Sequence, residues 1–158
     1  MSLHVIKLGG NEIDSADFLS GFARIVAART EPPVIVHGGG KEIASLQERL
    51  GLTPHFIEGM RVTDADSLRV VEMVLGGSIN QRLVRTLNLA GARAIGLRGA
   101  DLNLLRAEPL SLAVAQGDLG FVGVIKEVNT RALESFIAQG IVPVIAPNYG
   151  TVPAWLGR

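Results

Sequence analysis

The segment Val34-Ile35-Val36-His37-Gly38-Gly39-Gly40 joins a short apolar run to three consecutive glycines. An earlier segment, Leu3 to Leu8 followed by Gly9-Gly10, has the same arrangement. Short apolar runs closed by glycine are typical of buried strands that enter a turn. A helical pattern follows each turn, so the chain predicts an α/β fold: an open, mostly parallel sheet with helices on both faces. In such sheets, ligands bind outside the carboxyl ends of the strands.

The remaining segments extend this fold in both directions. A helix is predicted from about Lys41 to Leu50, and residues 51–62 are interpreted as a loop. Apolar residues at three- or four-residue spacing predict two amphipathic faces, one before and one after this region. The first face comprises Phe18, Phe22, Ile25 and Val26; the second belongs to a long helix that begins at 63–66 and comprises Leu68, Val71, Leu75, Ile79, Leu83 and Leu87. The last predicted elements are a strand at 92–97, an inserted β-hairpin within 102–126, a helix capped by Asn129, and a strand at 141–146 limited by Pro143.

Composition excludes several classes of protein. The chain has 158 residues, 47% of them hydrophobic, which is enough for a sizeable core and argues against disorder. Lysine and arginine total 15, as do aspartate and glutamate, so the overall charge gives no reason to expect a nucleic-acid or membrane partner. There is no cysteine, which excludes disulfides, cysteine-based zinc sites and cysteine nucleophiles. We expect a soluble, cytoplasmic protein, and we predict no metal site.

The two glycine turns are candidate anion-binding sites. Glycine lets backbone N–H groups approach an anion closely, and Lys7 would bring a positive charge to the first turn. Alone, Gly9-Gly10 is better interpreted as a tight turn beside a snorkelling lysine, because such turns are common, and the second turn can be interpreted as a bare loop. Two such turns on adjacent strands favour phosphate or carboxylate binding. His37 is interpreted as a packed, hydrogen-bonded residue at a strand end rather than a catalyst.

Two further features carry an interpretation. Arg61 precedes the long helix and belongs to the residue type best suited to bidentate carboxylate binding, although a lone arginine is usually a surface residue. Gly76 and Gly77 interrupt the long helix, where each should cost about 1 kcal/mol relative to alanine. A close packing contact, such as one with a partner chain, would explain them.

Six segments, taken in order, resemble the N-acetylglutamate kinases of the amino-acid kinase family. The resemblance covers nearly the whole chain, from Val5 to about Pro147. The matching segments are Val-Ile-Lys-Leu-Gly-Gly at 5–10, Val-Ile-Val-His-Gly-Gly-Gly at 34–40, Gly-Met-Arg-Val-Thr-Asp at 59–64, Glu-Met-Val-Leu-Gly-Gly-Ser-Ile-Asn at 72–80, Gly-Phe-Val-Gly at 120–123 and Pro-Val-Ile-Ala-Pro at 143–147.

The resemblance implies a fold, a reaction and residue roles. It implies a three-layer αβα architecture and transfer of the γ-phosphoryl of Mg-ATP to the side-chain carboxylate of N-acetyl-L-glutamate, on the route to arginine. It implies that the hairpin forms part of a lid over the acid and that the chain pairs as a homodimer, for which the glycine-interrupted helix is our candidate contact. The implied roles are charge stabilisation on the transferring phosphoryl by Lys7, phosphate binding by Gly9 and Gly10, acetylglutamate binding by Gly39 and Gly40, and clamping of the α-carboxylate by Arg61.

The chain departs from the family pattern in two places. Arg98 stands where the family usually has a small residue, and residues 148–151 do not match the Asn-x-x-Ala-Asp stretch that the family places after this strand. We therefore expect residues 1–158 to form one acid-binding domain without the nucleotide-binding half, with no tightly bound cofactor and little or no kinase activity alone. The alternatives are a non-catalytic module that binds an N-acyl amino acid and a related kinase that acts on an aminoadipate derivative.

Overall fold

A four-stranded parallel sheet forms the centre of the protein. The computed structural model describes residues 3–110 and 118–148. The strands lie in the order β1 (Val5–Leu8), β2 (Val34–His37), β8 (Val142–Ala146) and β5 (Ala94–Arg98). Every pairing between them is parallel, so all four carboxyl ends meet at one edge. The predicted fold class is confirmed.

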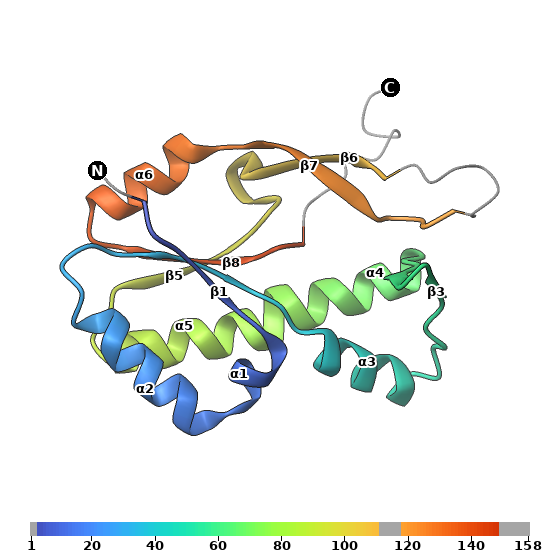
Figure 1. Ribbon diagram of the computed structural model, residues 1–158, viewed down its shortest axis with the longest axis horizontal. Helices are drawn as coiled ribbons and strands as arrows, with labels where there is room; N and C mark the ends of the chain where they lie inside the picture. The colour runs from blue at the N-terminus through green and yellow to red at the C-terminus, as the bar shows by residue number, and fades with distance from the viewer. Residues whose placement is uncertain (1–2, 111–117, 149–158) are drawn as a thin grey trace.

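Helices cover both faces of this sheet (Figure 1). One face packs on the helices that follow the glycine turns and on the long helix, around a core that includes Ile35, Val144 and Leu83. The other face packs on the last helix and on the hairpin, around Val34, Leu97 and Ile145. The first layer contains α1 (Gly10–Asp14), α2 (Ala16–Ala27), α3 (Gly40–Arg49), α4 (Ala65–Glu72), the π-helical η1 (Met73–Ile79) and α5 (Asn80–Leu89); the second contains the 3₁₀ turn η2 (Asp101–Asn103), β6 (Leu105–Pro109), β7 (Gly123–Val128) and α6 (Thr130–Ala138).

The predicted long helix is continuous from α4 through η1 to α5, but its buried face differs from the prediction in the first half. From Leu75 onward the predicted residues are buried, whereas before it Ser67, Val70 and Val74 are buried in place of Leu68 and Val71. A π-helical turn contains an extra residue relative to an α-helical turn. The segment η1 therefore shifts the buried face by one position, which a constant helical period cannot anticipate.

Three other predictions need correction. In α2 the buried residues are Leu19, Ala23 and Val26, while Phe18 and Ile25 are exposed. Pro143 lies within a central strand, β8, instead of limiting it, and it is in register with Ile95 of β5. The pairing of β8 with β2 begins only at Val144. The missing N–H of Pro143 therefore removes no hydrogen bond from the β2–β8 ladder. The region at 51–62 contains a short antiparallel pair, β3 (Phe56–Ile57) with β4 (Met60–Arg61).

Candidate functional site

The two glycine turns lie side by side at the carboxyl edge of the sheet. Leu8 at the end of β1 is in register with His37 at the end of β2. The Gly38 N–H donates to the Leu8 carbonyl at 3.0 Å, which joins the turns directly. Beyond them, Lys41 Nζ at the start of α3 donates to Asn11 Oδ1 in α1 at 2.5 Å. The structure therefore brings together the two segments that the sequence singled out as anion sites.

Gly39 and Gly40 occupy different environments although they are neighbours. A Cβ at Gly39 would lie 2.3 Å from Ile79 Cδ1 and 2.7 Å from Leu75 Cδ2, so this backbone packs directly on η1. A Cβ at Gly40 would meet no atom within 4 Å among the described residues. Gly39 is thus required by packing, whereas Gly40 borders open space at the first turn of α3.

The first turn presents Gly9 as the N-cap of α1 and Gly10 as its first residue. A Cβ at Gly9 would lie 2.6 Å from Glu12 Oε2, so the Glu12 carboxylate covers this backbone, and an anion bound here would have to displace it. Lys7 is exposed on β1, on the opposite face from Leu8, which is part of the core under α2 and α5. Lys7 therefore extends on the side of the sheet that carries α6 and the hairpin.

His37 is held in one orientation by hydrogen bonds at both ring nitrogens. Its Nδ1 lies 3.0 Å from the Gly38 carbonyl and its Nε2 lies 3.1 Å from Asn80 Nδ2, which also donates to the Val144 carbonyl at 2.9 Å. An amide nitrogen only donates, so Nε2 accepts and Nδ1 carries the proton. The interpretation of His37 as a packed, hydrogen-bonded residue is confirmed, because its side chain is 1% exposed.

Burial lowers the pKa of His37 below its ordinary value of 6.5, because the charged ring loses its solvation. The unfolded chain therefore takes up this proton first as the pH falls. We expect the free energy of unfolding to be fully retained above about pH 6.5 and to decline as the pH drops from there towards the lowered pKa of the folded state. Urea denaturation from pH 7.5 to 5.0 would measure this slope. The slope should be smaller in His37→Gln, and equal slopes would contradict the assignment.

Arg61 is positioned by two uncharged partners. Its Nη1 donates to Gln47 Oε1, and its Cζ lies 5.0 Å from the centre of the Phe56 ring, across the β3–β4 pair. Gln47 is 0% exposed and donates in turn through Nε2 to Ser67 Oγ at 3.0 Å. Neither partner carries a negative charge, and no carboxylate pairs with Arg61 within the described residues, so its half-buried positive charge is not neutralised there.

The β6–β7 hairpin returns to the segment that carries Arg61. The Thr63 N–H donates to the Leu119 carbonyl at 3.0 Å, and the Phe121 N–H donates to the Thr63 carbonyl at 2.8 Å. Gly120 between them has φ +66, and a Cβ there would lie 2.3 Å from the Thr63 carbonyl oxygen. Only glycine fits this approach. The segment that precedes β7 is therefore attached two residues after Arg61. Figure 1 shows this end of the hairpin extending over α4.

Arg98 lies at the carboxyl end of β5 and crosses the long helix. A Cβ at Gly76 would lie 2.9 Å from Arg98 Cδ, so Gly76 makes room for this side chain; Gly77 has open space around it among the described residues. The Arg98 guanidinium donates to both carboxylate oxygens of Asp101, at 3.3 Å and 3.1 Å. The close contact predicted for the glycine pair is thus made at Gly76, within the chain.

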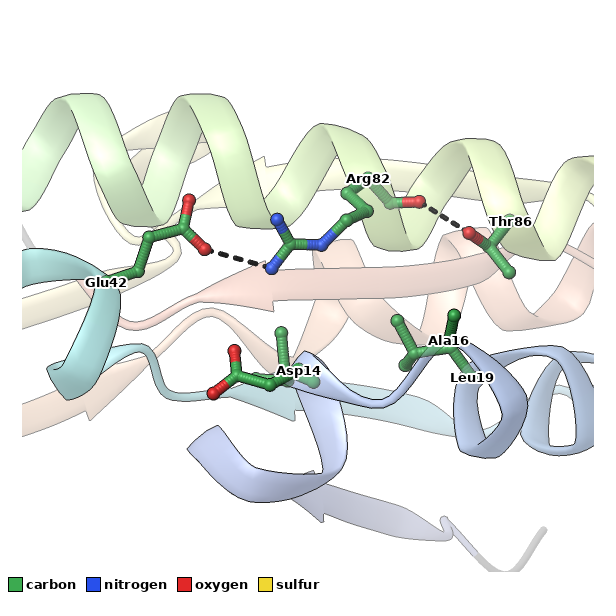
Figure 2. Close-up of a pocket in the computed structure, with 7 residues that line it drawn as sticks. Asp14, Ala16, Leu19, Glu42, Arg82 and Thr86 are labelled. Carbon is green, nitrogen blue, oxygen red and sulfur yellow. Dashed lines mark hydrogen bonds and ion pairs between the residues drawn. The ribbon is translucent and has the colours of Figure 1, made fainter.

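A separate pocket of about 350 Å³ lies between α1, α2, α3 and α5. Figure 2 shows Arg82 reaching from α5 to Glu42 on α3, with a nitrogen–oxygen distance of 3.0 Å, while Asp14 lies across the pocket. Burial alone would raise the pKa of Glu42, but hydrogen bonds from Ser78 and Arg82 hold it below its ordinary value. This ion pair fastens the start of α3, just after Gly40, to the long helix. The lining residues are Ile13, Asp14, Ala16, Leu19, Glu42, Arg82 and Thr86.

Some of the predicted site residues meet and others stay apart. The two glycine turns are in contact, and Arg61 contacts Gln47 on α3, the helix that begins at the second turn. The Lys7 side chain lies on the face of the sheet opposite to Leu8. None of these residues lines the pocket beside α2. Sequence reasoning missed Gln47 and Phe56; the available signal was a polar residue, Gln47, four positions after the buried Ile43 on the same helical face.

Two features are absent from residues 3–110 and 118–148. No cluster of three or more histidine, aspartate or glutamate side chains could hold a metal ion there. Within the same ranges no helix has the length and apolar character needed to cross a membrane. These residues therefore supply neither a metal centre of that kind nor a spanning helix.

Curated relatives match most of this chain. It is 50% identical over 143 residues to an acetylglutamate kinase of Roseiflexus sp. (strain RS-1), a match that covers 90% of this chain and 54% of the relative. It is 46% identical over 147 residues to an acetylglutamate kinase of Methanopyrus kandleri, covering 92% and 57%. The chain thus spans about half the length of the curated relatives it matches.

Solved structures share the fold. The protein smu.665 from Streptococcus mutans UA159 superposes with a TM-score of 0.75 at 31% identity, over 90% of this chain and 57% of that one. An N-acetylglutamate synthase from Neisseria gonorrhoeae, complexed with coenzyme A and N-acetyl-glutamate, gives 0.74 at 23% identity, over 91% and 33%. The sequence profile of the Amino acid kinase family matches residues 2–157. By its sequence and by the fold it shares with these structures, the chain belongs to the amino acid kinase family.

Proposed function

We propose that residues 1–158 form a domain that binds N-acetyl-L-glutamate, as the acid-binding part of a cytoplasmic acetylglutamate kinase in arginine biosynthesis. The observation that carries the proposal is the placement of Arg61 beside α3, the helix that starts at Gly40. Gly40 and Gln47 are separated by roughly 10 Å along a helix axis. A guanidinium and a glycine turn at that separation suit a small dicarboxylate with a hydrogen bond at each end.

In the proposed reaction, the side-chain carboxylate oxygen attacks the γ-phosphorus of Mg-ATP, the bond to the bridging oxygen breaks, and ADP leaves. This chemistry requires alignment and charge neutralisation rather than a covalent nucleophile. We assign clamping of the α-carboxylate to Arg61 and acid binding to Gly39 and Gly40. Lys7 would stabilise charge on the phosphoryl group, and Gly9-Gly10 would face the phosphates once Glu12 moves aside.

Support for this substrate comes from the relatives, which are acetylglutamate kinases at 45–50% identity over at least 90% of this chain. The homodimer remains a prediction. Gly77, with open space around it within the described part of the chain, is the residue of the glycine pair that a partner helix could approach.

Calorimetric titration with N-acetyl-L-glutamate, with free L-glutamate as the comparison, tests the proposal. We expect selective binding of the acetylated acid. A folded chain that binds neither compound would contradict the proposal. A titration with N-acetyl-L-aminoadipate would then test the alternative of a related kinase, and selective binding of other N-acyl amino acids would favour the non-catalytic module.

A further inference from the structure

Gln47 is a fully buried amide whose two ends are both used. Its Oε1 accepts from Arg61 Nη1 and its Nε2 donates to Ser67 Oγ at 3.0 Å. Its side chain is 0% exposed, so an unpaired end would remain without water. Gln47 also stands on the apolar face of α3, where Ile43 packs into the core. A polar residue at such a position needs a reason beyond packing.

The Arg61 guanidinium is restrained in two independent ways. The Arg61 Cζ lies over the half-exposed Phe56 ring, 5.0 Å from its centre, and Gln47 accepts from one of the guanidinium N–H donors. A guanidinium carries five such donors in one plane. The ring and the acceptor restrain the guanidinium from two directions, and its remaining N–H donors are left for a ligand.

The acceptor itself is anchored. Ser67, which receives the Gln47 amide, lies in the first turn of α4, where its N–H donates to Asp64 Oδ1 at 2.7 Å. Asp64 is the N-cap of that helix. A chain of hydrogen bonds therefore runs from Arg61 through Gln47 and Ser67 to Asp64, and joins the β3–β4 pair to α3 and α4.

We propose that Gln47 is a positioning residue that presets the Arg61 guanidinium to receive the α-carboxylate of an N-acylated amino acid. This inference rests on the proposed function, since it needs Arg61 to be the clamp. Arginine loses side-chain entropy when it is ordered. When Gln47 and Phe56 already order the Arg61 side chain in the free protein, this entropy is not lost on ligand binding. The affinity for the ligand is then higher, although no new contact to the ligand is made.

A double-mutant cycle tests this assignment. Gln47→Met keeps the length and the apolar stem but has no strong acceptor for Arg61. Measured by calorimetry with N-acetyl-L-glutamate, it should weaken binding about tenfold in the otherwise unchanged chain and less than twofold in the Arg61→Ala background. Ser67→Ala, which removes the anchor but not the acceptor, is the matched control and should change affinity less than threefold.

A second variant guards against loss of folding in Gln47→Met. Gln47→Glu keeps an acceptor for both Arg61 and the Ser67 hydroxyl, but it places a negative charge against the guanidinium. We expect it to fold, by circular dichroism, and to bind the dianionic acid more weakly than the unchanged chain. If both folded variants bind as tightly as the unchanged chain, the inference is overturned. A loss that is equally large in the Arg61→Ala background would also overturn it, because Gln47 would then act on the fold at large.

The failure of the proposed function gives a different pattern. If Arg61→Ala binds the acid unchanged, Arg61 is not the clamp, whatever Gln47 does. A readout without ligand then decides the positioning itself: the rate at which phenylglyoxal modifies Arg61, followed by peptide mass spectrometry. A guanidinium released in Gln47→Met should react several times faster, with Arg69 as an internal reference, and an unchanged rate would show that Gln47 does not hold Arg61.

Discussion

Replacing Arg61 with alanine is expected to weaken binding of N-acetyl-L-glutamate by at least ~2 kcal/mol, about thirtyfold. The reason is that its partners within 3–110 and 118–148 are uncharged, so the guanidinium offers an unneutralised charge and several N–H donors to a carboxylate. Removing one partner of a charged hydrogen-bonded pair leaves the other without compensation. Calorimetry at fixed ionic strength would measure the change.

Arg69→Ala is the matched control for this prediction. Arg69 lies on the neighbouring helix α4, pairs only with Asp66 at 3.0 Å among the described residues, and its side chain is 73% exposed. Its loss should leave acid affinity unchanged. A folded Arg61→Ala variant with wild-type affinity would exclude Arg61 as the clamp, and an equal loss in both variants would point to general electrostatic attraction instead.

Alanine at Gly39 is expected to lower the free energy of unfolding by about 1–3 kcal/mol, the usual cost of overpacking a core. Its Cβ would lie 2.3 Å from Ile79 Cδ1 and 2.7 Å from Leu75 Cδ2. These are side-chain ends, but both residues belong to the buried core, so they have little free space into which to move. Urea denaturation would measure the loss.

Gly40→Ala provides the comparison because its Cβ would enter open space. We expect its stability to change by less than about 0.5 kcal/mol, since alanine also favours the helix that begins there. Equal stabilities of the two variants would refute the packing argument. If the acid approaches the Gly40 backbone, Gly40→Ala should weaken binding while the fold is retained, which separates binding from packing at adjacent glycines.

Local sequence patterns predicted the sheet well, because each strand and its end are specified by residues that are adjacent in the sequence. A short apolar run followed by glycine specifies both the strand and the edge at which it ends, so the meeting of the two turns at Gly38 could be anticipated. The faces of the helices could not. In α2, Phe18, Phe22 and Ile25 have the same spacing as Leu19, Ala23 and Val26, and only the sheet determines which set is covered. In the long helix, η1 adds a residue to one turn, which leaves no trace in the spacing of apolar residues.

The candidate site divides in the same way. Arg61 could be proposed from its motif, but its partner Gln47 is fourteen positions earlier and is brought to it only by the packing of α3 against α4. The role of Gly39 also depended on tertiary structure, because the contact with Ile79 joins segments forty positions apart. A charged site residue such as Arg61 can be proposed from its residue type and motif. A residue that orients it, such as Gln47, is recognised only from its contacts in the folded structure.

The attachment of the segment around Gly120 to Thr63 links the position of the hairpin to ligand binding beside Arg61. Lifting the hairpin arm would break two backbone hydrogen bonds beside Arg61, at 3.0 Å and 2.8 Å. At about 0.5–1.5 kcal/mol for each bond, and with the buried Leu119 side chain exposed as well, the lifted form would be a small minority. A ligand that binds only the attached form would then gain apparent affinity from whatever stabilises this attachment. By reciprocity, a ligand that binds the attached form more tightly would lower the population of the lifted form.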